Sequence, residues 1–193
     1  MTSAPSSVVV LGFGPFQEIR DNPAARLASA LAERRDPAVR VRSEVMPVSY
    51  DRSPKRALDL VAACGASAVL GIGVARGRAA AMVELVAVNA AEGLDVDGRC
   101  PPVLDAGGPA RLAAHEDGVR LASELGVETS EDAGRYVCNA WLYRTTLGAG
   151  RRARPPAVAF LHIPAGGFDP DRLMRGIAQT WGRGALYSRR VPA

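Results

Sequence analysis

The chain has 193 residues, of which 48% are hydrophobic and 23% charged, with a net charge of +4, and these values suit one globular domain over residues 1–193 with a flexible start at 1–7. The charge is scattered and no apolar run approaches the ~20 residues that span a bilayer, so we expect no nucleic-acid partner and no membrane contact. Three cysteines without a disulfide or zinc-like spacing, and an amino terminus without signal-peptide features, predict a cytoplasmic protein that binds no metal.

Short apolar runs alternate with helical patterns along the chain. Strands are predicted at 8–12, 39–47, 68–73, 83–89, 127–130 and 157–163. Helices are predicted at 24–32, 53–63, 108–125, 138–147 and 170–181. The glycine- and proline-containing stretch 93–108 is expected to form a loop or a weak hairpin. This alternation predicts an α/β fold, a single domain in which helices cover both faces of a mixed, mostly parallel sheet.

Cys138 stands at the predicted start of a helix, directly after a turn that contains Gly134. The positive end of a helix dipole stabilises a thiolate, so this position suits a nucleophile. Free cysteines are more commonly buried as small apolar residues, and that alternative stays open for Cys138. Cys64 fits the buried alternative, because it lies at a predicted helix end, and Cys100 lies in the predicted loop.

Two residues are candidate partners of this thiol. His162 lies at the carboxyl end of the last predicted strand, where sites form in open α/β sheets, although a histidine there can also serve structure alone. Glu84 stands among apolar residues, where a carboxylate requires a partner. That partner is either an arginine, Arg76 or Arg78, or the distal nitrogen of His162. In the second case Cys138, His162 and Glu84 form a nucleophile, base and acid triad.

Two glycine-containing segments follow predicted strands and are candidate pocket walls. Phe13 and Phe16 lie in the first, and aromatic residues at a strand end suit a pocket for an apolar ring, although ordinary core packing is an equal alternative. Gln17 stands where a dinucleotide-binding loop requires its third glycine, which argues against nucleotide binding. The second segment, 73–78, offers backbone amides as hydrogen-bond donors.

A set of short motifs occurs in one order between residues 8 and 179. The motifs are Gly12-Phe13-x-Pro15-Phe16, Asn22-Pro23, Met46-Pro47-Val48, Gly73-x-Ala75-x-Gly77-Arg78, Glu84 with Ala87-Val88-Asn89, Ala133-Gly134-x-Tyr136-Val137-Cys138-Asn139, and Phe160-x-His162-x-Pro164. Each motif alone is weak. The ordered set, at this length, resembles the pyroglutamyl peptidase type I family, the pyrrolidone-carboxylate peptidases.

The resemblance implies a cysteine peptidase with an α/β fold of the phosphorylase/hydrolase type. Such an enzyme releases pyroglutamate from the amino terminus of peptides, needs no cofactor and is usually a homotetramer. By motif position the catalytic residues are Cys138, His162 and Glu84, and the substrate-binding residues are Phe13, Phe16, Val74 and Val137. The triad is the one that local chemistry also selects.

Three positions depart from the family pattern. Leu85 and Leu94 stand where the family has arginine, and Gln17 stands where it has glycine. The family arginine at the position of Leu94 lies near the reacting carbonyl. Oxyanion stabilisation then falls to backbone amides at the start of the nucleophile's helix, or to Arg76 or Arg99. The alternative is a weakly active or inactive homologue that binds pyroglutamyl or another small cyclic ligand.

Overall fold

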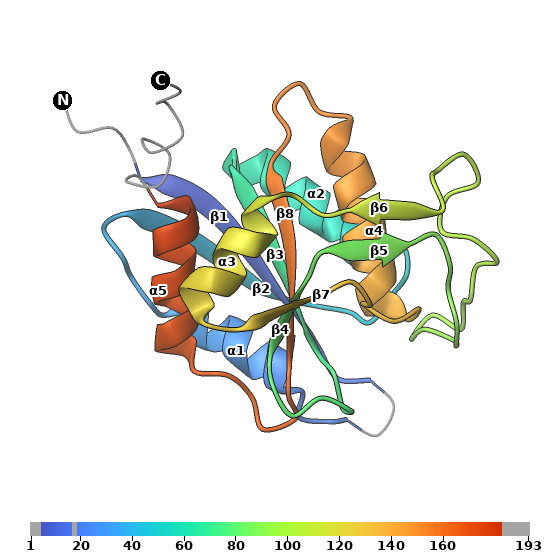
Figure 1. Cartoon of the computed structure of the whole chain (residues 1–193), viewed down its shortest axis with the longest axis horizontal. Helices are drawn as coiled ribbons and strands as arrows, with labels where there is room; N and C mark the ends of the chain where they lie inside the picture. Colours follow the sequence, from blue (N-terminus) through green and yellow to red (C-terminus); the bar gives the residue numbers. More distant parts are fainter. Residues whose placement is uncertain (1–4, 17–18, 183–193) are drawn as a thin grey trace.

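The computed structural model describes residues 5–16 and 19–182, and Figure 1 shows how its elements are arranged. The strands are β1 (Ser6–Phe13), β2 (Val39–Met46), β3 (Ala68–Val74), β4 (Met82–Glu84), β5 (Val86–Val88), β6 (Arg111–Ala113), β7 (Glu128–Ser130) and β8 (Ala157–Ile163). The helices are α1 (Pro23–Ala32), α2 (Arg52–Cys64), α3 (Asp117–Leu125), α4 (Val137–Gly150) and α5 (Pro170–Trp181). The predicted flexible start therefore overlaps β1 at residues 6 and 7, and Gln17 lies outside the described residues.

Within the described residues, six strands form one mixed sheet in the order β2-β1-β3-β8-β4-β7. β1 pairs in parallel with β2 and β3, and β3 pairs in parallel with β8. β4 runs antiparallel to β8 and parallel to β7. The predicted mixed, mostly parallel sheet is confirmed. The antiparallel β4 places Glu84 opposite Phe160, two residues from His162 on β8.

Helices cover both faces of this sheet (Figure 1). α1, α3 and α5 cover one face and share a buried cluster with Val8 and Val10 of β1, whereas α2 and α4 cover the other and share a buried cluster with Val9 and Leu11. Because successive strand residues point to opposite faces, the continuous apolar run of β1 reflects burial on both sides. None of the described helices combines the length and the apolar character that crossing a bilayer requires.

The single strand predicted at 83–89 was wrong: the run forms two short strands in different sheets. β4 belongs to the large sheet, and β5 pairs antiparallel with β6 in a sheet of two strands. Leu85 separates them. Its N–H donates to the carbonyl of Ser130 at 2.7 Å, and its carbonyl accepts from the N–H of Ala114 at 2.8 Å. The backbone groups of this apolar run are therefore divided between two partners, Ser130 on one side and Ala114 on the other. Buried N–H and C=O groups require such partners.

The helix predicted at 108–125 was wrong in its first half, because α3 begins only at Asp117. Residues 111–113 form β6 instead, and pairing with β5 satisfies the backbone groups that a helix would have used. Asn89 holds the preceding loop, since its side-chain oxygen accepts from the N–H groups of Leu104 and Asp105, both at 2.9 Å. The loop predicted at 93–108 is confirmed.

Candidate active site

Cys138 is the second residue of α4 and is half-buried at the carboxyl edge of the sheet, as the sequence predicts. Its sulfur lies close to β3, because a Cβ atom added to Gly73 would come within 2.7 Å of Sγ. This close approach explains the glycine at position 73. Tyr136 occupies the N-cap and makes no side-chain hydrogen bond to the helix start. The N–H groups of the first turn, including that of Cys138, have no intrahelical acceptor.

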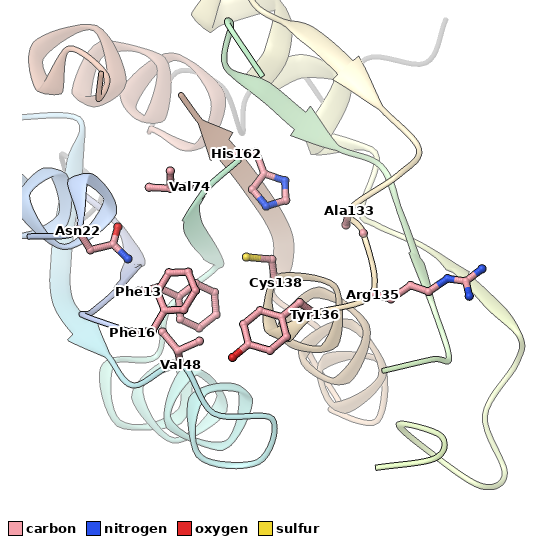
Figure 2. Close-up of a pocket in the computed structure, with 11 residues that line it drawn as sticks. Phe13, Phe16, Asn22, Val48, Val74, Ala133, Arg135, Tyr136, Cys138 and His162 are labelled. Carbon is pink, nitrogen blue, oxygen red and sulfur yellow. The ribbon is translucent and has the colours of Figure 1, made fainter. Parts of the chain in front are cut away.

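His162 and Glu84 meet where β8 and β4 pair in antiparallel fashion. The Nδ1 atom of His162 lies 2.7 Å from Oε1 of Glu84. Both side chains are buried: Glu84 is 0% exposed and His162 is 6% exposed. Figure 2 shows the His162 ring and the Cys138 sulfur facing the same space. With Nδ1 held by the carboxylate, the imidazole presents Nε2 as its second functional nitrogen.

Arg78 is a second partner of Glu84. Its guanidinium donates to Oε1 of Glu84 at 2.5 Å, to the carbonyl of Asp132 at 2.6 Å and to Oγ of Ser130 at 3.2 Å. Both partners considered for Glu84, an arginine and His162, are therefore present at the same oxygen. A buried carboxylate with two cationic or polar partners escapes the cost of an isolated charge.

These contacts move two pKa values. Burial raises the pKa of Glu84, but the hydrogen bonds from His162 and Arg78 and the charge of His162 favour the carboxylate, and the net change is downward. Burial lowers the pKa of His162, but Cys138 and Glu84 together raise it to about 9. The carboxylate is therefore ionised and the imidazole protonated at neutral pH, side by side in a buried site.

A mostly apolar cavity of about 160 Å³ opens beside Cys138 and His162 (Figure 2). Three of the four residues predicted to bind substrate line it, namely Phe13, Phe16 and Val74. Val137, the fourth, is fully buried in the core between the sheet, α2 and α4, and is not among the lining residues. Adjacent helical residues point in different directions, so Val137 faces the core where Cys138 faces the cavity.

Asn22 also lines the cavity, a role that its sequence motif did not reveal. Its Oδ1 accepts from the N–H of Ala24 at 2.9 Å and caps α1, as the Asn-Pro pair indicates. Its Nδ2 donates to the carbonyl of Gly14 at 2.8 Å. The same amide thus caps a helix and anchors the segment that carries Phe13 and Phe16. A capping pattern predicts the first contact but not the second.

Tyr136 is a further lining residue, which the sequence placed in the motif of Cys138 but not among the substrate-binding residues. Its ring centroid lies 6.1 Å from that of Phe16, and its hydroxyl donates to the carbonyl of Leu94 at 2.8 Å. Its position at the N-cap of α4, two residues before Cys138, was a sequence signal for this role, because residues at a helix start lie next to the space that the helix start faces. Its side-chain direction came only from the fold.

Leu85 and Leu94, two of the three positions that depart from the family pattern, do not line the ring cavity. The side chain of Leu94 is 64% exposed, and Leu85 packs against the core on the face of α1, α3 and α5. Arg99 pairs with Asp51 at 2.6 Å, outside the ring cavity. The guanidinium of Arg76 lies 5.9 Å from the centroid of the Phe16 ring. Of the two arginines considered for oxyanion stabilisation, Arg76 therefore lies near this cavity and Arg99 does not.

The two other cysteines lie elsewhere. Cys64 is the last residue of α2 and is half-buried, and Cys100 is exposed, with its sulfur 3.8 Å from the carbonyl oxygen of Ala91. Neither lines the ring cavity. Among the described residues, no group of three or more His, Cys, Asp or Glu side chains is arranged to hold a metal ion.

Sequence comparison assigns the family. The pyroglutamyl peptidase family model matches residues 6–170. The chain belongs to the pyroglutamyl peptidase family. The pyrrolidone-carboxylate peptidase of Gloeobacter violaceus is 35% identical to it over 178 residues, which cover 87% of this chain and 84% of that protein. That of Halalkalibacterium halodurans is 32% identical over 168 residues, covering 82% of this chain and 83% of that protein.

Solved structures of pyroglutamyl peptidases share the fold. The pyrrolidone carboxyl peptidase from Thermococcus litoralis has a TM-score of 0.82 at 20% identity, covering 97% of this chain and 100% of that one. The pyroglutamyl peptidase I from Bacillus amyloliquefaciens has a TM-score of 0.80 at 23% identity, covering 92% and 93%. The α/β fold that the resemblance implied is confirmed.

Proposed function

We propose that Cys138, His162 and Glu84 are the catalytic triad with which this pyroglutamyl peptidase releases N-terminal pyroglutamate from peptides. The observation that carries the proposal is the 2.7 Å contact between Nδ1 of His162 and Oε1 of Glu84, beside a thiol that faces the same cavity. A base oriented by a carboxylate, next to a nucleophile at a helix start, is the arrangement that acyl transfer requires.

The apolar cavity supports the choice of substrate. Phe13, Phe16 and Val74 form walls that suit a neutral lactam ring. An ordinary amino-terminal residue carries an ammonium group, and burying that charge without a partner costs far more than burying the ring. The cavity therefore discriminates by charge as well as by shape, and peptides with a free amino terminus are rejected.

The reaction proceeds in two steps. Nε2 of His162 takes the proton of the Cys138 thiol, or the two groups rest as an ion pair with the proton already on His162. The thiolate attacks the pyroglutamyl carbonyl carbon, and the electron pair of the C=O bond moves onto oxygen. When the C–N bond breaks, Nε2 of His162 gives its proton to the leaving amine, and a thioester remains. His162 then takes a proton from water as the water attacks the thioester, and the thiolate is released with free pyroglutamate.

The oxyanion is held by backbone N–H groups at the start of α4. Tyr136 at the N-cap satisfies none of these donors through its side chain. An aspartate, serine or asparagine at the N-cap would occupy a donor, whereas tyrosine leaves the first turn available to the substrate. This use of the helix start accounts for oxyanion stabilisation without an arginine at position 94.

A fluorogenic pyroglutamyl amide tests the proposal. Cys138→Ala is expected to lower kcat/KM by at least roughly 10³-fold, as removal of a nucleophile does elsewhere. The Cys64→Ala/Cys100→Ala double variant is the matched control, because it keeps Cys138 alone and should retain turnover and inactivation by iodoacetamide. Binding of pyroglutamate without turnover in the unmodified protein would instead favour the inactive homologue.

The quaternary structure and the cellular location remain predictions. The family resemblance implies a homotetramer, and the cysteine spacing and the amino-terminal sequence predict a cytoplasmic location. Analytical ultracentrifugation of the purified protein checks the first, and a species of monomer mass at micromolar concentration would contradict it. Fractionation of the source cells checks the second.

A further inference from the structure

A second hollow adjoins the ring cavity. Its volume is about 490 Å³, and it shares Phe16, Val74, Arg135 and Tyr136 with the ring cavity. Cys138 and His162 line the ring cavity but not this hollow. When the pyroglutamyl ring lies in the first cavity with its carbonyl at Cys138, the rest of the peptide must leave through an adjoining space. The second hollow shares a wall with the ring cavity and is therefore in position to receive the residue that follows pyroglutamate.

Arg76 lines this hollow from the turn that follows β3. The turn is fixed to the sheet, because the N–H of Ala75 donates to the carbonyl of Ile163 at 3.0 Å and the N–H of Arg78 donates to the carbonyl of Ala75 at 3.1 Å. The same turn sends Arg78 inward to the buried carboxylate and leaves Arg76 exposed. Of the two arginines in this turn, Arg78 therefore binds Glu84, and Arg76 lines the hollow.

The guanidinium of Arg76 is positioned at the boundary of the two spaces. It lies 5.9 Å from the ring centroid of Phe16, which lines both the ring cavity and the hollow. This distance is within the range of cation–π attraction. The contact holds the positive charge near the point where a bound peptide would pass from one space into the other.

The charge of Arg76 is not neutralised within the hollow. The other two charged lining residues, Arg135 and Glu92, pair with each other at 3.0 Å. Figure 2 shows the Arg135 side chain directed away from the Cys138 sulfur. Within the described part of the chain, Arg76 is therefore the lining charge with no salt-bridge partner, and a cation in a cleft attracts anionic groups.

We infer that Arg76 is a specificity-determining residue that favours peptides with a carboxylate on the residue after pyroglutamate. The inference rests on the proposed function, because it names the substrate class of the same site. The carboxylate has two possible sources, the side chain of an aspartate or glutamate and the terminal carboxylate of a pyroglutamyl dipeptide. Because Arg76 is exposed, the preference should be roughly two- to fivefold in kcat/KM at low ionic strength and should decline with added salt.

Two substrate pairs measure this preference. Pyroglutamyl-glutamate amide against pyroglutamyl-glutamine amide tests a side-chain carboxylate. Pyroglutamyl-alanine against pyroglutamyl-alanine amide tests the terminal carboxylate. The ratio of kcat/KM for acid over amide should exceed one in at least one pair, and that pair identifies the source. Arg76→Gln should bring the ratio to about one, and Arg76→Glu should bring it below one.

Arg40→Gln is the matched control. Arg40 is an exposed arginine on β2, where it pairs with Ser7, and it lines neither the ring cavity nor the hollow. The substitution makes the same change in net charge, so an unchanged ratio in this variant excludes a general charge effect. Equal kcat/KM for acids and amides in the unmodified enzyme would overturn the inference and leave the proposed function intact. An acid-over-amide ratio that is unchanged in Arg76→Gln would also overturn the inference and leave the proposed function intact. Failure to cleave any of the four substrates would overturn both.

Discussion

The Nδ1 atom of His162 lies 2.7 Å from Oε1 of Glu84, although the two residues are 78 positions apart in the chain. The antiparallel pairing of β4 with β8 brings them together. The same carboxylate oxygen also accepts a hydrogen bond from Arg78. Glu84 therefore links the proposed catalytic base to the turn after β3. The first three predictions concern Glu84 and its two partners, Arg78 and His162.

Replacing Glu84 by glutamine should lower kcat far more than it raises KM. The side chain keeps its shape but loses the charge that stabilises the imidazolium, and Glu84 does not line the ring cavity. Loss of the acidic member of such a triad costs up to about 10⁴-fold in rate. Steady-state kinetics on a pyroglutamyl amide measure the change. Glu44→Gln, a carboxylate on β2 paired with two surface arginines, is the control and should leave kcat unaltered.

Replacing Arg78 by alanine should destabilise the fold as well as slow catalysis. Arg78 is 26% exposed and Glu84 is fully buried, so the substitution leaves a buried carboxylate with one partner fewer. We expect the free energy of unfolding to fall by about 1–3 kcal/mol. Urea denaturation measures it. Lys55→Ala breaks the exposed pair with Asp59 and should cost less than about 0.5 kcal/mol. Equal losses in the two variants would contradict the role given to Arg78.

The free energy of unfolding should fall as the pH rises from neutral to alkaline values. The pKa of His162 is raised from 6.5 to about 9, so its contribution is fully present below pH 6.5 and lost as the pH rises through 9. The expected loss of unfolding free energy is on the order of 3 kcal/mol. Urea titrations at several pH values check it.

Cys138→Ala should weaken this pH dependence, because it removes one of the two groups that raise the pKa of His162. NMR titration of the imidazole resonances follows the proton directly, and the chain has only one other histidine, His115. A His162 titration that is the same in the variant and in the unmodified protein would exclude the thiol as a partner.

Gly73→Ala should damage the site without replacing any of the three proposed catalytic residues. Its Cβ would lie 2.7 Å from Sγ of Cys138 and 2.9 Å from Cζ of Phe160. The thiol must move, and a displacement of about 1 Å costs roughly 10²-fold in rate. The overpacked core should also lose about 1–3 kcal/mol of stability. Gly77→Ala should show neither effect, because among the described residues no atom beyond its two chain neighbours lies within 4 Å of the added Cβ.

Two substitutions of Asn22 should separate its role as the cap of α1 from its role in shaping the ring cavity. Asn22→Ala removes both the cap on Ala24 and the hydrogen bond to Gly14, and should cost about 1–2 kcal/mol from the cap alone. Asn22→Ser restores a capping hydroxyl but not the donor to Gly14. We expect thermal stability to recover in the serine variant while KM for a pyroglutamyl amide stays raised. Full recovery of KM would show that the Gly14 contact does not shape the cavity.

Most elements could be predicted because their signals are local. The doubly apolar runs of β1, β3 and β8, the Asn22 cap of α1 and the cysteine at the start of α4 each follow from neighbouring residues. The errors at 83–89 and 108–125 have a different origin. Leu85 divides its backbone hydrogen bonds between Ser130 and Ala114, and residues 111–113 become a strand only because β5 is beside them. Such pairing depends on residues far away in the chain.

The sequence by itself determined the α/β fold, the membership of the pyroglutamyl peptidase family and the three residues proposed for catalysis, since motifs and periodicity are properties of adjacent residues. Tertiary structure decided which side chains share a space. It turned Val137 into the core, brought Asn22 and Tyr136 to the ring cavity, and sent Arg78 inward while leaving Arg76 over Phe16. These outcomes depend on strand order and helix rotation, which arise from packing across the whole chain.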